Sequence, residues 1–172
     1  MAFYLDTSAV VKLVAAEAET PALTAWIASE QNEFVSCDLL RTELFRTVRR
    51  GSPDSVTRAR NVVDAITILA VPSATFERAG ELAPPTLRNL DAIHLAAALE
   101  LADDLDGLVT YDERLAAAAA SYGINVIAPG SVGTPTVRTA PRRAGKDRKD
   151  RVNRSLDALA TADPDDRSDA GR

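Results

Sequence analysis

A short, mostly apolar run that ends in an aspartate occurs three times in this sequence, and this pattern restricts the fold more than any other feature. The runs are residues 3–5, 34–37 and 108–111, and the aspartates that follow them are Asp6, Asp38 and Asp112. An apolar run without alternation is typical of a buried strand in a parallel sheet. The carboxyl ends of parallel strands meet at one edge, where open α/β sheets bind ligands. We therefore expect the aspartates to gather at that edge.

Helical segments separate these runs along the chain. We expect strands over residues 2–6, 34–37, 66–71, 108–111 and 124–127, with a turn at 103–107, and helices over residues 7–16, 20–29, 38–50, 55–65, 73–82, 89–102 and 113–122. Strands that alternate with helices favour right-handed crossovers and a sheet covered on both faces. The prediction is an α/β fold with a central parallel sheet of about five strands.

The composition changes after residue 130. Residues 1–130 carry a net charge of −8, whereas residues 131–172 are rich in Gly, Pro, Thr, Arg, Lys and Asp and carry +3. Such a segment buries too little apolar surface to offset the entropy lost on ordering. We expect one domain at 1–130 and a disordered, charged tail at 131–172. Because the domain is acidic, a nucleic-acid partner needs local cations at the surface that it contacts.

The cysteine count and the hydropathy restrict the compartment. Cys37 is the single cysteine among 172 residues, so no disulfide forms within the chain. No apolar run is long enough to span a bilayer, and the first residues lack the basic start of a signal peptide. These features favour a cytoplasmic protein that makes no membrane contact.

Two further carboxylates join the aspartates at the predicted edge. Glu43 lies inside the helix that follows Asp38, and Asp91 lies in the first turn of the helix over 89–102. Two like charges 4 Å apart repel by about 4 kcal/mol at an effective dielectric of 20, so a cluster needs protons or a cation. All-oxygen sites suit Mg²⁺ or Mn²⁺, which activate water and polarise phosphoryl oxygens. The alternative is that each aspartate only caps a helix or lies in its first turn.

Four segments of the sequence resemble the signature blocks of PIN domains, and most closely those of the VapC-type toxins of bacterial toxin–antitoxin pairs. The segments are Leu5-Asp6-Thr7-Ser8, Glu43 within residues 39–44, Leu90-Asp91-Ala92-Ile93-His94-Leu95-Ala96 and Val109-Thr110-Tyr111-Asp112. They occur in the family's order within residues 2–128. The tail lies outside the resemblance and departs from a compact family member.

The resemblance implies a PIN-like three-layer α/β/α sandwich that acts as a Mg²⁺- or Mn²⁺-dependent endoribonuclease. The acidic quartet is then Asp6, Glu43, Asp91 and Asp112, with Asp6 and Asp91 as the most direct metal ligands. The hydroxyl side chains expected near the metal are Thr7, Ser8 and Thr110. Asp38 becomes a helix N-cap. The implied substrate is tRNA or ribosomal RNA, and the implied partner is a small antitoxin, in a homodimer or a toxin–antitoxin heterooligomer.

Competing enzyme classes lack residues that their chemistry needs. A haloacid-dehalogenase-like phosphatase needs a second aspartate where this chain has Ser8, and a receiver domain needs a late lysine, which residues 51–137 lack. No phosphate-binding glycine loop is present. A PIN-like module that binds RNA or protein without turnover, and a housekeeping PIN ribonuclease, stay as alternatives.

The remaining candidates have structural readings as well as functional ones. His94, the single histidine, lies three residues after Asp91 on the same helical face, where it can orient a carboxylate, contact RNA or serve the core. Arginines on the helix that carries Glu43 can grip phosphate or complement the helix dipole, and Arg88 is a similar candidate. The arginines on that helix are Arg41, Arg46, Arg49 and Arg50.

Overall fold

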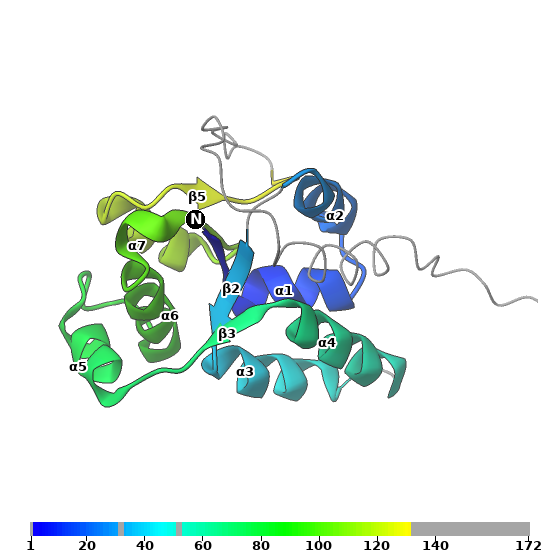
Figure 1. Cartoon of the computed structure of the whole chain (residues 1–172), viewed down its shortest axis with the longest axis horizontal. Helices are drawn as coiled ribbons and strands as arrows, with labels where there is room; N and C mark the ends of the chain where they lie inside the picture. The colour runs from blue at the N-terminus through cyan, green and yellow to red at the C-terminus, as the bar shows by residue number, and fades with distance from the viewer. Residues whose placement is uncertain (1, 31–32, 51–52, 132–172) are drawn as a thin grey trace, which may run out of the picture.

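The computed structural model describes residues 2–30, 33–50 and 53–131. Its centre is a parallel sheet with the strand order β3-β2-β1-β4-β5 (Figure 1). The strands are β1 Ala2–Leu5, β2 Glu33–Cys37, β3 Thr67–Leu69, β4 Leu105–Val109 and β5 Val126–Ile127. The predicted parallel α/β sheet of five strands is therefore confirmed.

Helices cover both faces of this sheet. They are α1 Thr7–Val14, α2 Thr20–Ser29, α3 Leu39–Val48, α4 Pro53–Ala65, α5 Ser73–Glu81, α6 Asn89–Leu99 and α7 Glu113–Ser121, with a 3₁₀ turn at Ala102–Asp104. Buried side chains of α1 to α4 share one core cluster with the sheet, and those of α6 and α7 share another. α5 packs on α6 (Figure 1). The three-layer α/β/α arrangement follows.

The central strand β1 supplies both cores, because successive side chains of a strand point to opposite faces. Phe3 and Leu5 belong to the cluster with α1 to α4, while Tyr4 belongs to the cluster with α6 and α7. Phe3 meets Trp26 edge-on, with ring centroids 5.0 Å apart, and stacks on Phe34 at 6.1 Å. Aromatic pairs in these geometries add to the stability that burial alone supplies.

The bounds of β4 correct two of the sequence expectations. The strand predicted over 108–111 is two residues too long at its end, because β4 ends at Val109. The predicted turn at 103–107 is wrong in its second half, because β4 already begins at Leu105. The reason lies in Gly107, where an added Cβ would sit 2.8 Å from Ile127 Cδ1 and 2.9 Å from the Asn125 carbonyl. Glycine here allows β5 to approach closely and does not mark a turn.

The topology leaves one switch point at the carboxyl edge of the sheet. From β1 the chain builds outward through β2 to β3, and it then returns to place β4 and β5 on the other side of β1. Ligands of open α/β sheets bind where the strand order reverses in this way. The edge between β1 and β4 is therefore where a functional site is expected.

Two further expectations concern the ends of the chain and the membrane. The predicted disordered tail, apart from its first residue, lies outside the described residues. Among the described helices, none is long and apolar enough to cross a bilayer.

Candidate active site

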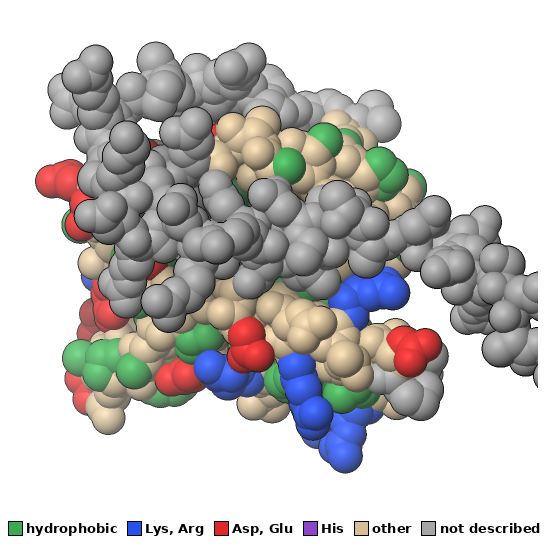
Figure 2. Space-filling view, turned by 45° about the vertical axis from the view of Figure 1, so that its right-hand side comes forward, with side chains coloured by type: hydrophobic (Ala, Val, Ile, Leu, Met, Phe, Trp, Pro, Cys, Tyr) green, Lys and Arg blue, Asp and Glu red, His purple; other side chains and the backbone are tan. Residues whose placement is uncertain are grey.

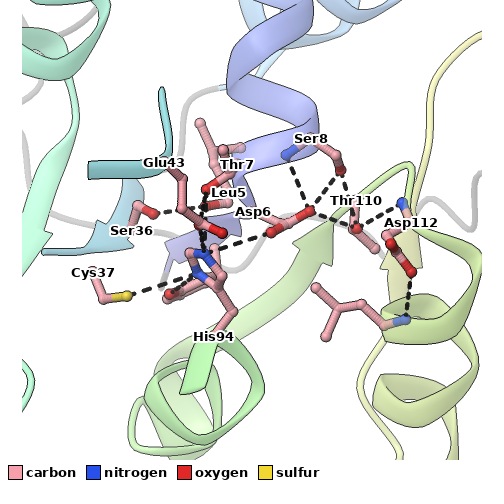
Figure 3. Close-up of polar contacts among 12 residues, drawn as sticks. Leu5, Asp6, Thr7, Ser8, Ser36, Cys37, Glu43, His94, Thr110 and Asp112 are labelled. Carbon is pink, nitrogen blue, oxygen red and sulfur yellow. Dashed lines mark hydrogen bonds and ion pairs between the residues drawn. The ribbon is translucent and has the colours of Figure 1, made fainter. Parts of the chain in front are cut away.

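Asp6 follows β1 directly and is held by hydroxyl groups at the switch point. Its Oδ2 accepts hydrogen bonds from the Ser8 amide at 3.1 Å, the Ser8 hydroxyl at 2.6 Å and the Thr110 hydroxyl at 3.0 Å (Figure 3). Ser8 Oγ in turn accepts from the Tyr111 amide at 2.9 Å, which ties the start of α1 to the end of β4. Asp6 is only 5% exposed, so its carboxylate is both buried and fixed in orientation.

Asp6 also caps α1, so the capping alternative holds for this residue. An N-cap aspartate uses one oxygen to satisfy the first amides of its helix. In Asp6 that oxygen is Oδ2, whereas Oδ1 lies 3.7 Å from His94 Nε2. Capping therefore leaves a second oxygen of the same carboxylate for another role.

Glu43 reaches the site from α3 and is held by two donors. Its Oε2 accepts hydrogen bonds from the Thr7 hydroxyl at 2.6 Å and from His94 Nε2 at 2.8 Å (Figure 3). Burial alone raises the pKa of this carboxyl, but these two bonds outweigh burial and lower its pKa below the ordinary value. Glu43 is therefore ionised at neutral pH.

His94 is the centre of a polar group inside the core. Its Nδ1 lies 2.9 Å from the Tyr4 hydroxyl and 3.7 Å from Cys37 Sγ. Burial lowers the pKa of His94, but its contacts with Cys37 and Glu43 and the charge of Asp6 prevail and raise the pKa to about 10. With both ring nitrogens protonated, Nδ1–H donates to the Tyr4 oxygen and Nε2–H donates to Glu43. His94 therefore orients a carboxylate, one of the roles predicted for it.

Asp91 carries the most unusual carboxyl group of the site. It lies in the first turn of α6, and its Oδ2 is buried without a hydrogen-bond partner. Burial and the negative charges of Asp112 and Asp6 raise the pKa of this carboxyl. A buried, unpartnered carboxylate oxygen costs free energy, so it is expected to have a functional reason.

Asp112 closes the site from the start of α7. Its Oδ1 caps the helix by accepting from the amides of Arg114 at 2.8 Å and Leu115 at 3.1 Å. Its own amide donates to the Thr110 hydroxyl at 3.1 Å, so Thr110 links it to Asp6. The second oxygen, Oδ2, lies 3.9 Å from Arg88 Nη1. As in Asp6, one oxygen caps a helix and the other remains for other contacts.

The structure thus brings the predicted acidic residues to one sheet edge, although not as a closed metal cage. Within the described ranges, no group of three or more His, Cys, Asp or Glu side chains has the arrangement of a preformed metal site. Mg²⁺ does not require one, because it keeps several waters and binds through one or two carboxylates together with substrate phosphates. The unpartnered Asp91 Oδ2, beside the charges of Asp6 and Asp112, fits such a cation.

Asp38 behaves differently from the other two strand-end aspartates, Asp6 and Asp112. It occupies the N-cap position of α3, as expected, but its side chain makes no capping hydrogen bond. It is exposed and lies 3.9 Å from Arg41 Nε. Its backbone is already helical, with φ −55° and ψ −25°, and this conformation explains the missing cap.

Sequence reasoning missed Tyr4 as a part of the site. The side chain looked like an apolar member of β1, yet its hydroxyl is a direct partner of His94. The signal was present in principle, because the hydroxyl of a buried tyrosine usually finds a hydrogen-bond partner.

The arginines of α3 lie on the surface. Figure 2 shows Lys and Arg side chains gathered on the lower part of the molecule, where α3 and α4 lie in Figure 1. The exposed arginines on these helices, or directly after α3, include Arg41, Arg46, Arg49, Arg50 and Arg60. Their exposure fits both of the readings given to the α3 arginines from the sequence.

The sequence is similar to a known protein family and to proteins named as ribonucleases. The family model described as PIN domain matches residues 3–121. Ribonuclease VapC47 of Mycobacterium tuberculosis (strain CDC 1551 / Oshkosh) is 41% identical over 133 residues, which cover 75% of this chain and 98% of the relative. Ribonuclease VapC46 of the same species (strain ATCC 25618 / H37Rv) is 40% identical over 128 residues, covering 74% and 98%.

A solved structure supports the fold independently. The crystal structure of Mycobacterium tuberculosis VapC20, described as a Sarcin-Ricin loop cleaving toxin, superposes with a TM-score of 0.57 at 18% identity. The match covers 80% of this chain and 99% of that chain. At this identity the likeness shows the fold alone, which is the PIN-like sandwich predicted from the four blocks.

Proposed function

This chain belongs to the PIN domain family, and on that basis we propose that it is the toxin of a toxin–antitoxin pair and a metal-dependent endoribonuclease. The observation that carries the proposal is the buried, unpartnered Asp91 Oδ2 at the β1/β4 switch point, close enough to Asp6 and Asp112 for their charges to act on it. Relatives named as ribonucleases, matched over nearly their whole length, support the activity.

The residues that would hold the cation are Asp6 through Oδ1 and Asp91 through Oδ2. Both oxygens belong to carboxylates, the ligand type that Mg²⁺ and Mn²⁺ prefer. Asp6 is already oriented by Ser8 and Thr110, so it loses little freedom on binding. Asp112 and Glu43 would complete the site, directly or through water.

The protein's own groups then prepare a phosphodiester for hydrolysis. A bound divalent ion polarises phosphoryl oxygens and activates water for attack. Glu43 stays ionised because Thr7 and His94 donate to Oε2, which leaves Oε1 to accept a hydrogen bond from water and orient it. Thr110 holds Asp6 and Asp112 in a fixed relation, because it bonds to the carboxylate of the first and the amide of the second.

The finer features of the function are proposals of the same kind. We propose tRNA or ribosomal RNA as the substrate class, a small antitoxin protein as the inhibitory partner, and a homodimer or toxin–antitoxin heterooligomer as the assembly. The cytoplasmic location and the division into a domain at 1–130 and a tail at 131–172 also stay predictions.

The test is cleavage of total bacterial RNA by the purified, antitoxin-free full chain. We expect discrete fragments with Mg²⁺ or Mn²⁺ and none with EDTA, because the carboxylates cannot polarise the phosphoryl oxygens as a divalent ion does. Asp6→Asn should abolish the fragments, since it removes a ligand charge while keeping the shape of the side chain. Sequencing of the fragment ends identifies the target.

Two outcomes would contradict the proposal. Fragments that persist undiminished in EDTA and in Asp6→Asn would show that cleavage requires neither a metal ion nor Asp6. A folded wild-type chain that leaves both tRNA and ribosomal RNA intact with metal present would favour a binding module without turnover.

A further inference from the structure

Two arginines flank the acidic site from the starts of the two helices that carry Asp91 and Asp112. Arg88 is the N-cap residue of α6, directly before its first turn, and Arg114 lies in the first turn of α7. Both side chains are exposed, and Arg88 Nη1 lies 3.9 Å from Asp112 Oδ2. Their positive charges favour the ionised form of Asp91, against the effect of its acidic neighbours.

The negative charge of the domain requires nearby cations if RNA is to bind at this site. An RNA backbone carries one negative charge for each phosphate, and the site that is to receive it holds four carboxylates in a domain of net charge −8. A single divalent ion does not offset this repulsion. Cations of the protein must therefore lie where the backbone enters.

Lys12 is not suited to this task, although it lies near the same edge. Its Nζ contacts the carboxylates of Glu17 at 2.5 Å and Glu19 at 2.8 Å and sits over the ring of Tyr111. It is also nearly buried. Its charge is therefore already used inside the protein.

Unlike Lys12, Arg88 has a fixed backbone but a guanidinium that is only loosely held. Its carbonyl accepts the Ala92 amide at 2.8 Å, while its side chain is 59% exposed. The 3.9 Å contact with Asp112 is longer than a hydrogen bond, so the guanidinium can exchange that partner at little cost. A planar guanidinium matches a phosphate through two parallel N–H donors.

We propose that Arg88, assisted by Arg114, binds a backbone phosphate of the RNA beside the bond that the acidic residues cleave. The inference rests on the proposed function, since it assigns residues that position the substrate of that reaction. Arg88 and Arg114 are then positioning residues, which hold the strand against Asp91 and Asp112 without entering the chemical step.

The test measures RNA binding by the full chain in EDTA, so that the probe stays intact. The probe is a fluorescein-labelled single-stranded RNA of mixed sequence, followed by anisotropy across a range of salt concentrations. Arg88→Ala should weaken binding about tenfold, the loss expected for one hydrogen bond to a charged group. The slope of log affinity against log salt should fall by about 0.7, the value for one lost phosphate contact on a single strand.

Two variants make the result specific. Arg60→Ala removes the same charge from an exposed position on α4, which packs on the opposite face of the sheet from α6, and should match the wild type. Arg88→Lys keeps the positive charge but lacks the paired N–H donors of a guanidinium. It should recover the salt slope but only part of the affinity. Unchanged melting temperatures establish that the variants are folded.

The inference is overturned if Arg88→Ala and Arg60→Ala bind RNA with the same affinity and the same salt slope. Its failure is distinct from failure of the proposed function. If the wild type cleaves RNA but Arg88→Ala and Arg60→Ala bind RNA with the same affinity and salt slope, only the role of Arg88 is contradicted. If Arg88 contributes to RNA binding but the wild type never cleaves RNA, only the proposed activity is contradicted.

Discussion

Asp91→Asn should make the metal-free protein more stable and the enzyme inactive. Asp91 Oδ2 is buried without a partner, and Asp112 and Asp6 repel its charge. Removing that charge should raise the free energy of unfolding by about 1 kcal/mol, as relief of a strained functional site commonly does. Loss of a metal ligand should lower the cleavage rate by at least about 100-fold, since metal assistance contributes several kcal/mol. Denaturant unfolding in EDTA and RNA cleavage in Mg²⁺ measure the two effects.

The matched control is Asp38→Asn, at an exposed strand-end aspartate whose nearest charged partner is Arg41. It should leave both cleavage and stability nearly unchanged. The increase in melting temperature that Mg²⁺ produces in the wild type should persist in Asp38→Asn and vanish in Asp91→Asn. An Asp91→Asn protein that is less stable in EDTA, or that cleaves at the wild-type rate, would contradict this reading of the site.

His94→Ala should produce the largest loss of stability. His94 is 1% exposed and links Glu43 to the Tyr4 hydroxyl. Its removal leaves a cavity, an ionised Glu43 without its charged donor and a buried Tyr4 hydroxyl without its hydrogen bond to the imidazole. Breaking a buried charged pair in this way costs about 3 kcal/mol or more. Thermal and urea unfolding measure the loss.

A graded series keeps this prediction testable if His94→Ala does not fold. Tyr4→Phe removes only the hydroxyl partner and should cost about 1 kcal/mol. His94→Gln keeps an amide donor for Glu43 and should fall between Tyr4→Phe and His94→Ala. A melting temperature of His94→Ala equal to that of the wild type would contradict the role given to the histidine.

The pH dependence of stability offers a second readout for His94. Its pKa is raised from 6.5 to about 10, so the imidazolium contributes its full stabilisation below pH 6.5 and loses it as the pH rises through 10. The free energy of unfolding in EDTA should therefore decline between these values in the wild type. The decline should be smaller in His94→Gln.

Much of the architecture could be read from the sequence because local patterns matched the global fold. Asp6 and Asp112 follow apolar strands directly, so a parallel sheet alone brings them to one edge. Glu43 and Asp91 were placed at the same edge because helix starts also gather there, and the family's blocks singled them out as members of an acidic quartet. The two readings of Asp6, a cap and a site residue, are compatible because each carboxylate oxygen has its own role.

The parts that the sequence did not predict depend on tertiary contacts. The role of Gly107 depends on how closely β5 approaches, and a glycine in sequence indicates a turn equally well. Tyr4 became visible as a polar residue only when α6 placed His94 above β1. Arg88 was a candidate from the sequence, but Arg114 was not, because no local pattern specifies that the starts of α6 and α7 lie close together.

A crystal structure of the full chain soaked in Mn²⁺, with data collected at the manganese absorption edge, would show whether Asp6 and Asp91 bind a divalent cation. We expect an anomalous peak at the β1/β4 switch point, bound by oxygens of Asp6 and Asp91 at about 2.1 Å, the bond length typical of small divalent ions with oxygen ligands. No peak at this edge under saturating Mn²⁺, or a peak held by other residues, would contradict this expectation.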